Sequence, residues 1–559
     1  MKRQSKAIIF LLIALLSLTS LFACKNDAPK TDETKPAETE TKTEEKTEEK
    51  TETTEDKKDD KVEKTDGPVE GGTFIVSLGK EPSQFNPCAT ADNAAYQIIQ
   101  NTFNKLLKIN GNGEIINDLA ESYEYEDEGK TLIFHLHKDV KWHDGEDFSA
   151  EDVKWTFDEI MDKKGFASSS LSSVESVEVK DKDTVVFHLS QPDSGLLGYI
   201  AWMGTYIMPK HIYEGTDWLT NDANYNPIGT GPFKFVEMVE GESITLEKNP
   251  DFFGEGPYVD KLIFKIIPDD NTAYQAWLND EIDQTLAGVP ATEIEKLKKD
   301  DRFRFVPKSW PNKSYLCFNM ESGIFTDKNL REAVLYGIDR EDIYKRVLKE
   351  QGTISEYFIA PEYAWAINKD VKSPERDLAK AQELIEAAGY TKDADGYYFE
   401  TTIDTFPGWD DFVVVLTEQF KEMGIKLNHN SMDDPTYDEK VLERKDFDFT
   451  VLGGYVGPDI SAMGIRFVTG GPMNYGNYSN PELDKEFELA NIATEYEDRA
   501  VHYRRIQEIL YEDLPVVYFS NKGVEYPIKN YVKGSPADEA TPYTTEGEFS
   551  RVWIDPSLR

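Results

Sequence analysis

The segment from Lys25 to Asp66 decides where this chain can fold, because the segment itself cannot form a core. Its sequence, KNDAPKTDETKPAETETKTEEKTEEKTETTEDKKDDKVEKTD, is almost wholly Thr, Glu, Lys and Asp, and Val62 is its only branched aliphatic residue. Such a segment buries too little apolar surface to offset the entropy lost on ordering. It therefore predicts a disordered acidic tether, and folding is left to the residues from Pro68 onward.

The residues before the tether are typical of an export signal. A basic start is followed by an uncharged apolar run from Ala7 to Ala23, which is shorter than the roughly 20 residues that a spanning helix needs. The end of this run, Leu21-Phe22-Ala23-Cys24, resembles a bacterial lipobox, in which the cysteine is lipidated and becomes the mature N-terminus. We predict a signal peptide over 1–23 and a lipidated Cys24 that opens the tether over 24–68. A plain signal peptide cut nearby is the alternative.

An anchor on a polar tether predicts a folded module at the extracellular face of a bacterial cell membrane, and we expect a Gram-positive bacterium. No later apolar run reaches 18 residues, so the chain is not expected to span the membrane. The net charge of −43 argues against nucleic-acid binding. Besides Cys24, only Cys88 and Cys317 occur. We expect two buried free thiols, and a disulfide between them is the alternative.

The length of 559 residues predicts several domains, because a single core stops growing at roughly 250–300 residues. Alternation predicts strands at 71–79, 446–455 and 516–520, and helical spacing of apolar residues predicts a helix over 94–109. Caps and glycine stops predict further helices over 327–338, 339–348, 374–390, 412–424 and 496–515. Strands mixed with helices throughout indicate an α/β or α+β protein with two large lobes.

The stretch LIFHLHKDVKWHDGEDFSAEDVKWTF, residues 132–157, holds three of the seven histidines and several acids. Its first part alternates as a strand, His143-Asp144-Gly145 is typical of a turn, and Ser149 stands where a helix N-cap is expected. Each titratable residue then has a local structural role or faces solvent. Two histidines at i, i+2 could hold a metal, but no further ligand is fixed by spacing, so we predict scaffold and no metal.

Several blocks of this sequence, in this order, resemble the family-5 solute-binding proteins of bacterial ABC importers, the oligopeptide- and dipeptide-binding group. They are LHKDVKWHDGEDFSAEDVKWTF, IGTGPFKFVEMVEGE with LEKNPDFFGEGPYVDKLIFKII, FTDKNLREAVLYGIDREDIYKRVL, SPERDLAKAQELIEAAGY, NYGNYSNPELDKEFELA and RRIQEILYEDLPVVYF. The resemblance covers about residues 70–559. It implies an α/β, two-lobed, periplasmic-binding-protein-like clamshell of type II with an extra inserted domain. Such a protein is a binding component and not an enzyme, has no cofactor, and is expected to be a monomer.

The resemblance also implies a domain organisation. Domain I would combine 69–111, 229–308 and 515–559, domain II would be inserted at 112–228, and domain III would be 309–514. The two crossings between lobes, near 308 and 515, would form the hinge. The block from 132 to 157 would then belong to the scaffold of domain II.

In peptide-binding members of the family, the ligand lies extended between the lobes, pairs like an added strand, and places its α-ammonium on an aspartate. The corresponding segment here is VLGGYVGPDIS. It makes Asp459 the predicted carboxylate, places Tyr455 where the family usually has tryptophan, and assigns strand pairing to the backbone of Gly453, Gly454, Tyr455 and Val456. The predicted facing wall is Ala91, Asp92 and Asn93. A turn role for Asp459 is the alternative, because Gly-Pro-Asp is ordinary loop chemistry.

The expected partners are a peptide and the permease of an ABC importer. A second hypothesis keeps the family and changes the cargo to a nickel chelate, haem, sugar or opine, with Trp310, Trp365 and Trp409 as stacking candidates or, as we favour, core residues. A third is an extracellular hydrolase that uses acidic pairs such as Asp410/Asp411 or Asp433/Asp434. We expect these pairs to lie in loops, and no motif of a serine, zinc or P-loop enzyme is present.

Overall fold

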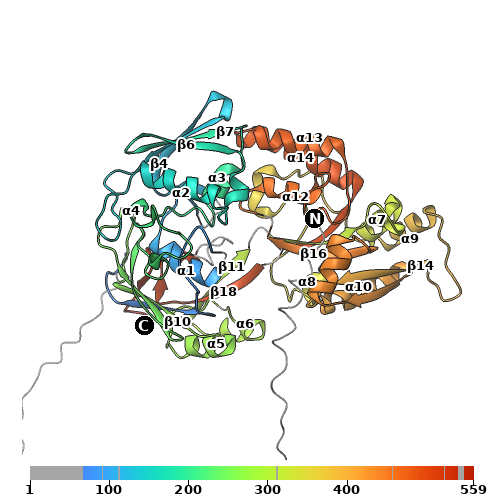
Figure 1. The fold of residues 1–559 in the computed structure, drawn as a ribbon. Helices are drawn as coiled ribbons and strands as arrows, with labels where there is room; N and C mark the ends of the chain where they lie inside the picture. Colours follow the sequence, from blue (N-terminus) through green and yellow to red (C-terminus); the bar gives the residue numbers. More distant parts are fainter. Residues whose placement is uncertain are drawn as a thin grey trace, which may run out of the picture. The chain divides into compact units, whose positions relative to one another are not determined.

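The computed structural model describes residues 67–90, 92–110, 114–286, 288–309, 312–455, 457–521, 523–538 and 547–559, apart from the side chains of residues 291, 308, 309, 455 and 537. The predicted signal peptide, Cys24 and the tether up to residue 66 lie outside these ranges. Ala91, Trp310 and Val456 also lie outside them. Figure 1 shows the elements formed by the described residues.

The first sheet combines an N-terminal strand with three strands from the middle of the chain. Its order is β1-β10-β9-β8, with bounds Thr73–Leu78, Lys261–Ile266, Ser243–Lys248 and Phe233–Val239. β1 is parallel to β10, and the other pairs are antiparallel. Phe74, Val76 and Leu78 alternate along β1 and are buried in one core. Ile75 packs on the opposite face with a cluster from α5 (Asp270–Leu278) and α6 (Ala291–Leu297).

The second sheet is antiparallel, with the order β4-β5-β7-β6. Its strands are Ala120–Glu126, Thr131–Leu136, Thr184–Leu189 and Val174–Asp181. Helix α2 (Ala150–Asp162) packs against this sheet, and the ring of Phe157 meets that of Phe187 edge-on, with centroids 4.8 Å apart. Ser149 caps α2 in a reciprocal capping box with Asp152. The prediction of a strand, a turn and a capped helix over residues 132–157 is confirmed.

Short elements surround these two sheets. They are α1 (Asn93–Thr102), β2 (Leu107–Ile109), β3 (Ile115–Asn117), η2 (Asp127–Gly129), η3 (Ser168–Leu171), α3 (Leu196–Ile200), α4 (Lys210–Tyr213), η4 (Asp222–Asn224), β19 (Val532–Lys533), η9 (Pro536–Asp538) and β20 (Trp553–Ile554). β2 and β3 form one small antiparallel pair, and β19 and β20 form another.

The third sheet has six strands in the order β13-β17-β12-β16-β14-β15. Their bounds are Thr353–Ile354, Val516–Asn521, Asn312–Phe318, Phe449–Tyr455, Phe399–Thr405 and Ile425–Ser431. β14 is parallel to both β15 and β16, and the remaining pairs are antiparallel. The central strand β12 is buried along its whole length. The sheet is therefore covered on both faces.

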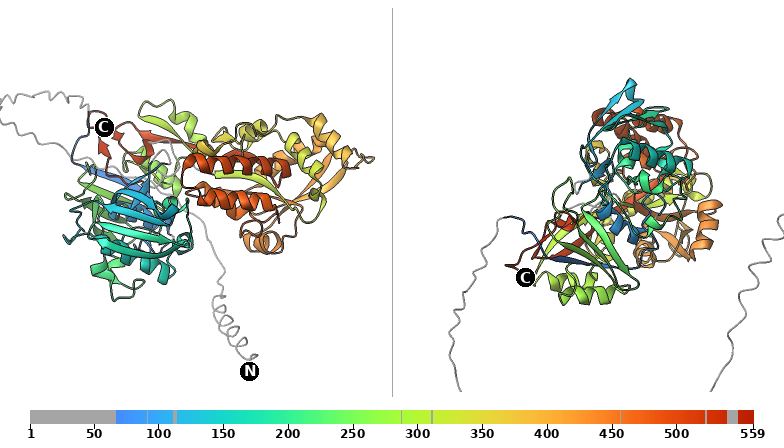
Figure 2. Two further views of the ribbon diagram at one scale, coloured as in Figure 1. Left: turned by 90° about the horizontal axis from the view of Figure 1, so that it is seen from above. Right: turned by 60° about the vertical axis from the view of Figure 1, so that its left-hand side comes forward.

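Alternation along β12 assigns its side chains to two different cores. Leu316 and Phe318 pack with α7 (Lys328–Gly337), α8 (Arg340–Arg346), α9 (Leu378–Ala387) and α10 (Asp410–Met423). Tyr315 and Cys317 pack on the other face with α13 (Pro481–Ile492) and α14 (Tyr496–Asp513). The left view of Figure 2 shows α13 and α14, in red, side by side. The remaining short elements are η5 (Ile324–Thr326), η6 (Pro361–Ala366), α11 (Asp434–Tyr437), η7 (Asp438–Glu443), η8 (Ile460–Met463) and α12 (Gly464–Phe467).

Two antiparallel segments connect the part of the chain that holds the first sheet with the third sheet. β11 (Phe303–Ser309) pairs with β18 (Gly523–Lys529), and the chain continues from β11 into β12 and from β17 into β18. The two connections therefore run beside each other as paired strands; the second leaves the third sheet after β17, at residue 521, rather than near 515. The predicted domain boundaries stay a prediction, because all the described residues belong to one compact unit.

The predicted helix over 94–109 is wrong in its second half. Helix α1 ends at Thr102, and Phe103 is extended, with φ −116° and ψ 161°. The carbonyl of Thr102 accepts a hydrogen bond from the backbone N–H of Gly231 at 2.8 Å. Leu107–Ile109 instead forms β2 and pairs with β3. The apolar residues keep a helical spacing beyond Thr102, but contacts with a distant segment end the helix there.

The other predicted helices are confirmed, together with the residues that end them. Asp327, Asp339 and Asp377 each cap a helix by accepting a backbone hydrogen bond. Gly424 ends α10 in the left-handed conformation, with φ +85°, and the chain then enters β15 as predicted.

Both cysteines of the folded part, Cys88 and Cys317, are buried and free, so the prediction of two free thiols is confirmed and the disulfide alternative is wrong.

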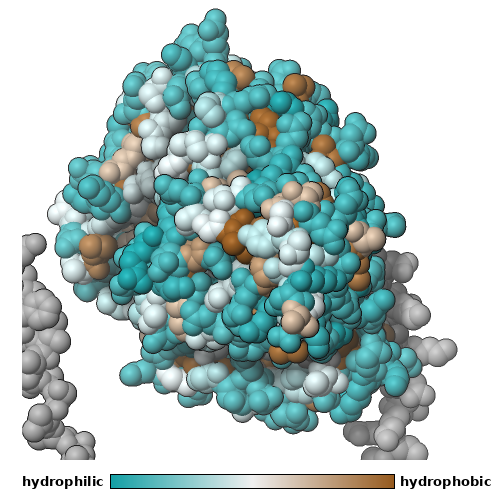
Figure 3. All heavy atoms as spheres, turned by 90° about the vertical axis from the view of Figure 1, so that its right-hand side faces the viewer, coloured by the Kyte–Doolittle hydropathy of each residue, from teal (hydrophilic) through white to brown (hydrophobic). Residues whose placement is uncertain are grey.

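On the face drawn in Figure 3, hydrophobic residues occur in separate spots among hydrophilic ones. Among the residues that the structure describes, no helix is both long and apolar enough to cross a membrane.

Candidate functional site

One edge of strand β16 is open over its second half. β12 pairs with β16 along its whole length, including Ser314 with Gly453 and Lys313 with Gly454. On the other side, β14 pairs with β16 only at Phe449 and Thr450. Within the described part of the chain, the backbone from Val451 to Tyr455 thus has no strand partner on that side. Gly453 is exposed and Gly454 half-buried. An exposed row of unpaired N–H and C=O groups is the surface on which an extended peptide adds as a strand.

Glycines keep this edge free of side chains. A Cβ placed on Gly454 would have no atom within 4 Å, and its φ of +131° disfavours any other residue. Further on, Gly457 has φ +109°, and a Cβ there would lie 2.3 Å from the Cβ of Ala462. The Tyr363 hydroxyl donates a hydrogen bond of 2.7 Å to the Gly457 carbonyl. The turn that carries Pro458 and Asp459 is therefore held firmly at the end of the strand.

Asp459 is buried, with 7% of its surface exposed. Its Oδ1 accepts a hydrogen bond from the backbone N–H of Ser461 at 2.9 Å and caps η8. The side chain of Arg499, from the first turn of α14, donates to both carboxylate oxygens at 2.6 and 3.1 Å. The carboxylate is thus bound by a cation of the protein itself, and three of its roughly four lone-pair positions are used.

The environment of this ion pair is apolar and aromatic. Arg499 is 3% exposed and lies over the rings of Trp365 and Tyr503, at 5.3 and 5.7 Å from their centroids. Burial alone would lower the pKa of Arg499, but the neighbouring Asp459 carboxylate outweighs that effect and the pKa is raised. Arg499 therefore stays charged at any physiological pH and places a cation of the protein itself at the predicted ammonium position.

Helix α3, from the predicted domain II, packs directly on the Asp459 turn. A Cβ on Gly198 would lie 3.1 Å from the Cβ of Asp459, and a Cβ on Gly195 would lie 2.6 Å from the Ser461 hydroxyl. The neighbouring Ser194 donates hydrogen bonds from its backbone N–H and its hydroxyl to carbonyls of α13, at 2.8 and 3.1 Å. Asp459 therefore lies where the predicted domains II and III touch, and away from bulk solvent.

The structure places the predicted facing wall at the start of α1. Asp92 is the N-cap: its side chain accepts from the Ala94 N–H at 2.9 Å and forms an ion pair with Lys80. The backbone N–H of Asp92 donates to the Thr90 hydroxyl, and its carbonyl accepts from Tyr96. Asn93 is exposed in the first turn. Among the described residues, no hydrogen bond or ion pair joins Asp92 or Asn93 to the 453–459 segment. Ala91, Val456 and the side chain of Tyr455 are not described.

The histidines of the 132–157 stretch have structural surroundings. His143 accepts a hydrogen bond from the Gly229 N–H on Nδ1, at 3.2 Å, and its Nε2 donates to the Gly231 carbonyl at 3.0 Å. This arrangement fixes a neutral tautomer, and burial lowers the pKa of His143 to about 4. His135 is partly exposed beside Glu124. In the described ranges, no group of three His, Cys, Asp or Glu side chains is placed to hold a metal ion.

The acidic pairs named for a hydrolase have roles at helix ends, so the prediction that they lie in loops is wrong. Asp410 and Asp411 open α10, Asp433 caps α11 by accepting from the Thr436 N–H at 2.9 Å, and Asp434 is the first residue of that helix. Acidic residues are favourable there because they face the positive end of the helix dipole. Trp409 packs against Phe406 and Phe412, as expected for a core residue.

Comparison with known proteins decides the family. The family described as "Bacterial extracellular solute-binding proteins, family 5 Middle" matches residues 114–474, which are more than half of the chain. The chain belongs to this family. It is a solute-binding protein of an ABC importer and not an enzyme, and it has the mixed α/β fold of periplasmic binding proteins.

Three proteins of known structure are similar to this chain. The oligopeptide-binding protein AppA of Bacillus subtilis is 30% identical over 483 residues, which cover 82% of this chain and 88% of AppA. The structure of AppA in complex with a nonapeptide has a TM-score of 0.66 and 28% identity, and it covers 87% of this chain and 99% of that one. The structure of the substrate-binding protein CtaP of Listeria monocytogenes has a TM-score of 0.77 and 26% identity, and it covers 87% of this chain and 100% of CtaP. NikZ of Campylobacter jejuni, in complex with Ni(L-His), shares the fold with a TM-score of 0.69 and 24% identity, covering 86% and 99%.

Sequence reasoning about this family-5 protein missed Arg499, which lies 40 residues from Asp459 in the chain. A signal was present, because Arg499 falls at helical spacing on the stripe that includes Tyr503 and Leu510, both buried. A charged residue on such a stripe needs a partner, and the acid that supplies it comes from a separate turn.

Proposed function

We propose that the solute captured by this protein is a peptide, bound in extended form along the open edge of β16. The observation that carries the proposal is the backbone from Val451 to Tyr455, which, among the strands that the structure describes, is paired only by β12 and only on one side. Main-chain hydrogen bonds bind a peptide without regard to its sequence, which suits an importer of mixed peptides. The nonapeptide bound by AppA supports the same choice of ligand class.

The predicted role of Asp459 as the ammonium ligand belongs to this proposal in a modified form. An incoming α-ammonium has one remaining lone-pair position on the carboxylate and meets Arg499, which already neutralises it. The contribution of the ammonium is therefore smaller than that of a salt bridge to a free carboxylate. Of the predicted facing wall, Asn93 is exposed, whereas the backbone groups of Asp92 are bonded locally.

The proposed working cycle uses the paired crossing strands as a hinge. The predicted domains I and II would move against domain III about β11–β12 and β17–β18, and the contact of α3 with the Asp459 turn would belong to the closed form. Ligand can favour closure only through a higher affinity for that form. Lipidation of Cys24 would hold the protein beside its permease at the membrane. Metabolic labelling with a tritiated fatty acid tests the anchor. Incorporation of the label into the Cys24→Ala variant would contradict lipidation at Cys24.

The direct test of the peptide proposal is mass spectrometry of solute released from the purified protein, followed by titration with pentaalanine. Replacing a peptide N–H by N-methyl at alternate positions removes one main-chain hydrogen bond worth about 1 kcal/mol, so affinity should fall roughly fivefold at positions that face β16. Equal affinity of all methylated peptides, or no peptide binding, would overturn the proposal.

A second candidate keeps the family and replaces the peptide by a solute without an ammonium group. The observation that favours it is the internal neutralisation of Asp459 by Arg499. NikZ, which has the same fold, is seen with Ni(L-His). A thermal-shift panel of peptides, oligosaccharides, haem and nickel–histidine separates the two candidates, and stabilisation by one of the non-peptides alone would favour the second.

A further inference from the structure

Ser194, in the loop before α3, joins the predicted domain II to the predicted domain III by two hydrogen bonds. Its backbone N–H donates to the Asn491 carbonyl at 2.8 Å, and its hydroxyl donates to the Ala490 carbonyl at 3.1 Å. Both acceptors lie in the last turn of α13. Ala490 is 296 residues away from Ser194 in the chain, so only the fold brings the two segments together.

Through these bonds, Ser194 supplies the C-terminal cap of α13. The last carbonyls of a helix have no partner within the helix and need one from elsewhere. In α13, the Ala493 N–H donates to the Leu489 carbonyl, and Ser194 donates to the next two carbonyls. The last turn of α13 holds no basic residue that could offset the negative end of the helix dipole. Donors from the predicted domain II therefore complete a helix of the predicted domain III.

The loop that carries Ser194 is fixed within its own domain. The Asp193 carboxylate accepts hydrogen bonds from the Ser173 hydroxyl at 2.7 Å and from the Gly195 N–H at 3.0 Å. Gly195 is the N-cap of α3 and has helical backbone angles, φ −82° and ψ −18°. Because these bonds lie entirely within the predicted domain II, the position of Ser194 does not depend on α13.

Glycines let the two surfaces meet closely around these bonds. A Cβ on Gly195 would lie 2.6 Å from the Ser461 hydroxyl, and a Cβ on Gly129 would lie 3.3 Å from the Thr494 side chain. The Tyr199 hydroxyl, on α3, is hydrogen-bonded to Ser461. A larger side chain at Gly195 would therefore separate the surfaces, because close-packed atoms leave it no space. It would not strain α3 itself, since any residue adopts the backbone angles of Gly195.

This contact is separate from the proposed hinge and from the open edge of β16. The proposed hinge consists of β11–β12 and β17–β18, and neither Ser194 nor α13 belongs to it. Within the described residues, Ser194 forms no hydrogen bond with the Val451–Tyr455 edge that the cargo is proposed to pair with. Its effect on closure therefore does not depend on the chemistry of the cargo.

We propose that Ser194, together with Gly129 and Gly195, forms a latch that favours the closed form of this protein before any cargo is bound. The inference rests on the proposed function, because it takes closure to be a movement about the paired crossing strands. In the open form the α13 carbonyls would face water, whereas in the closed form they gain the two Ser194 donors. Cargo then binds to an equilibrium that the protein itself has shifted toward closure, so the latch raises the apparent affinity by one factor for every cargo.

The first arm of the test measures closure without cargo, on the full chain freed of solute as checked by mass spectrometry. In small-angle X-ray scattering, we expect Gly195→Leu to have a larger radius of gyration than the wild type. Gly79→Leu, at an exposed glycine where an added Cβ has no atom within 4 Å, is the matched control and should keep the wild-type radius. If Gly195→Leu does not fold, Gly195→Ala replaces it, because its Cβ already meets the Ser461 hydroxyl.

The second arm measures affinity for pentaalanine and for N-acetylated pentaalanine. Ser194→Ala removes one of the two hydrogen bonds, so Kd should rise by up to about fivefold, and by the same factor for both peptides. Gly195→Leu should raise Kd further, again equally for both. Ser190→Ala, which removes a hydroxyl bond of 3.2 Å to the Ser173 carbonyl within the predicted domain II, is the matched control and should leave Kd unchanged.

The outcomes separate the latch from the proposed function. Equal radii of gyration for the cargo-free wild type and Gly195→Leu overturn the latch. A rise in Kd for the free peptide alone also overturns it, because the effect would then lie at the Asp459 carboxylate. If neither peptide binds, the proposed function fails, and scattering still decides the latch because that measurement uses no peptide.

Discussion

Arg499 and Asp459 form a buried, two-pronged ion pair in which Nη2 donates to Oδ1 at 2.6 Å and Nη1 donates to Oδ2 at 3.1 Å. Their side chains are only 3% and 10% exposed. The pair joins the first turn of α14 to the turn after β16, and helix α3 packs on it from the predicted domain II. One contact thus serves both the stability of the predicted domain III and the electrostatics of the candidate site.

Asp459→Ala should destabilise the protein by about 3–5 kcal/mol, because Arg499 would remain buried without a counter-charge. Urea unfolding measures the loss. The matched control is Glu482→Ala, which breaks an exposed ion pair with Arg505 on the same helix and should cost less than about 1 kcal/mol. If the two variants lose equal stability, the buried pair does not contribute as described.

The same ion pair predicts how the amino terminus of a peptide is read. Because Arg499 already neutralises the carboxylate, acetylation of the peptide amino terminus should lower affinity less than about tenfold, below the loss expected for a salt bridge to an unpaired buried carboxylate. Calorimetric titration of free and acetylated pentaalanine provides the comparison. A loss of more than a hundredfold would mean that the ammonium displaces Arg499.

The free energy of unfolding should fall at acidic pH, where His143 becomes protonated. Its pKa is lowered from 6.5 to about 4 by burial, so the unfolded chain binds a proton between these values and the folded chain does not. The stabilisation from neutral His143 is complete above pH 6.5 and is lost as the pH falls toward 4, by about 2 kcal/mol at pH 5 relative to pH 8. Urea unfolding of wild type and His143→Gln at both pH values isolates this loss, and His135→Gln, at a partly exposed site, is the control. An identical pH dependence in wild type and His143→Gln would contradict the assignment.

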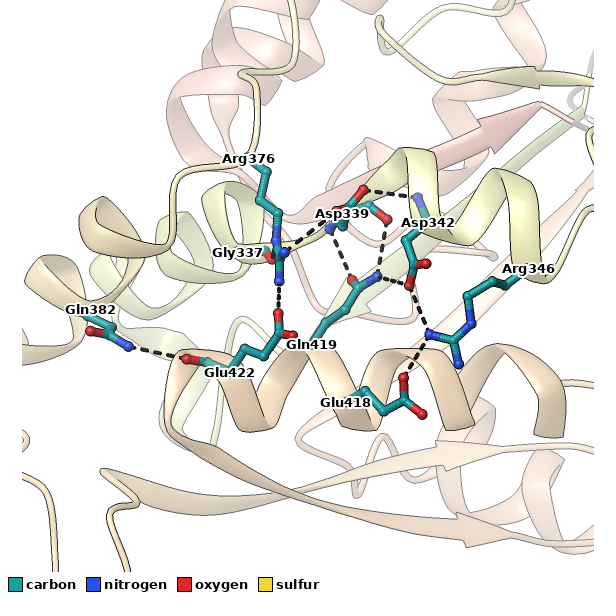
Figure 4. Close-up of polar contacts among 9 residues, drawn as sticks. All are labelled: Gly337, Asp339, Asp342, Arg346, Arg376, Gln382, Glu418, Gln419 and Glu422. Carbon is teal, nitrogen blue, oxygen red and sulfur yellow. Dashed lines mark hydrogen bonds and ion pairs between the residues drawn. The ribbon is translucent and has the colours of Figure 1, made fainter.

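Gln419 should prove essential for the packing of α10 against α8. Figure 4 shows its amide between the two helices, where Oε1 accepts from the Asp339 N–H at 3.0 Å and Nε2 donates to the Asp339 carbonyl at 3.1 Å. Gln419→Leu would leave the Asp339 N–H unpaired, at a cost of roughly 1–3 kcal/mol, whereas the Asp339 carbonyl keeps its hydrogen bond from the Ile343 N–H. Thermal unfolding measures the effect. Gln382→Ala, which removes an exposed hydrogen bond of 3.2 Å to the Glu422 carbonyl in the same view, should change stability by less than about 0.5 kcal/mol.

The two thiols should not react in the native protein. Cys88 and Cys317 are buried, and burial raises the pKa of Cys317 to about 12 and that of Cys88 further, so neither forms a thiolate at neutral pH. Ellman's reagent should titrate no fast thiol before unfolding and one from each of these cysteines in urea. A fast-reacting thiol in the native protein would contradict the burial, and none in urea would indicate a disulfide.

The local elements were predictable because their signals are local. Asp327, Asp339 and Gly424 fix the ends of their helices through bonds and conformations within a few residues, and the strand, turn and capped helix of 132–157 follow from alternation and Ser149. The helix over 94–109 was predicted too long for the opposite reason. Its end depends on Gly231, which is more than 100 residues away and bonds the Thr102 carbonyl.

The candidate site shows the same division between local signals and contacts of distant segments. The sequence pointed to Gly453, Gly454 and Asp459 through a resemblance over one short segment, but it contained no sign that β14 leaves β16 after Thr450 or that Arg499 occupies the carboxylate. Lys313 is buried, with 1% of its surface exposed, but it was not singled out, because one lysine in a strand is usually read as a solvent-facing residue.

By itself, the sequence determined the family, the mixed α/β architecture, most helix ends and the free state of the thiols, since these follow from composition, periodicity and caps that act over a few residues. Only the tertiary structure decided which backbone edge is open, which cation faces Asp459 and which lysine is buried. The physical reason is that pairing and burial are properties of contacts between distant segments, and a side chain acquires its charge environment only when those segments meet.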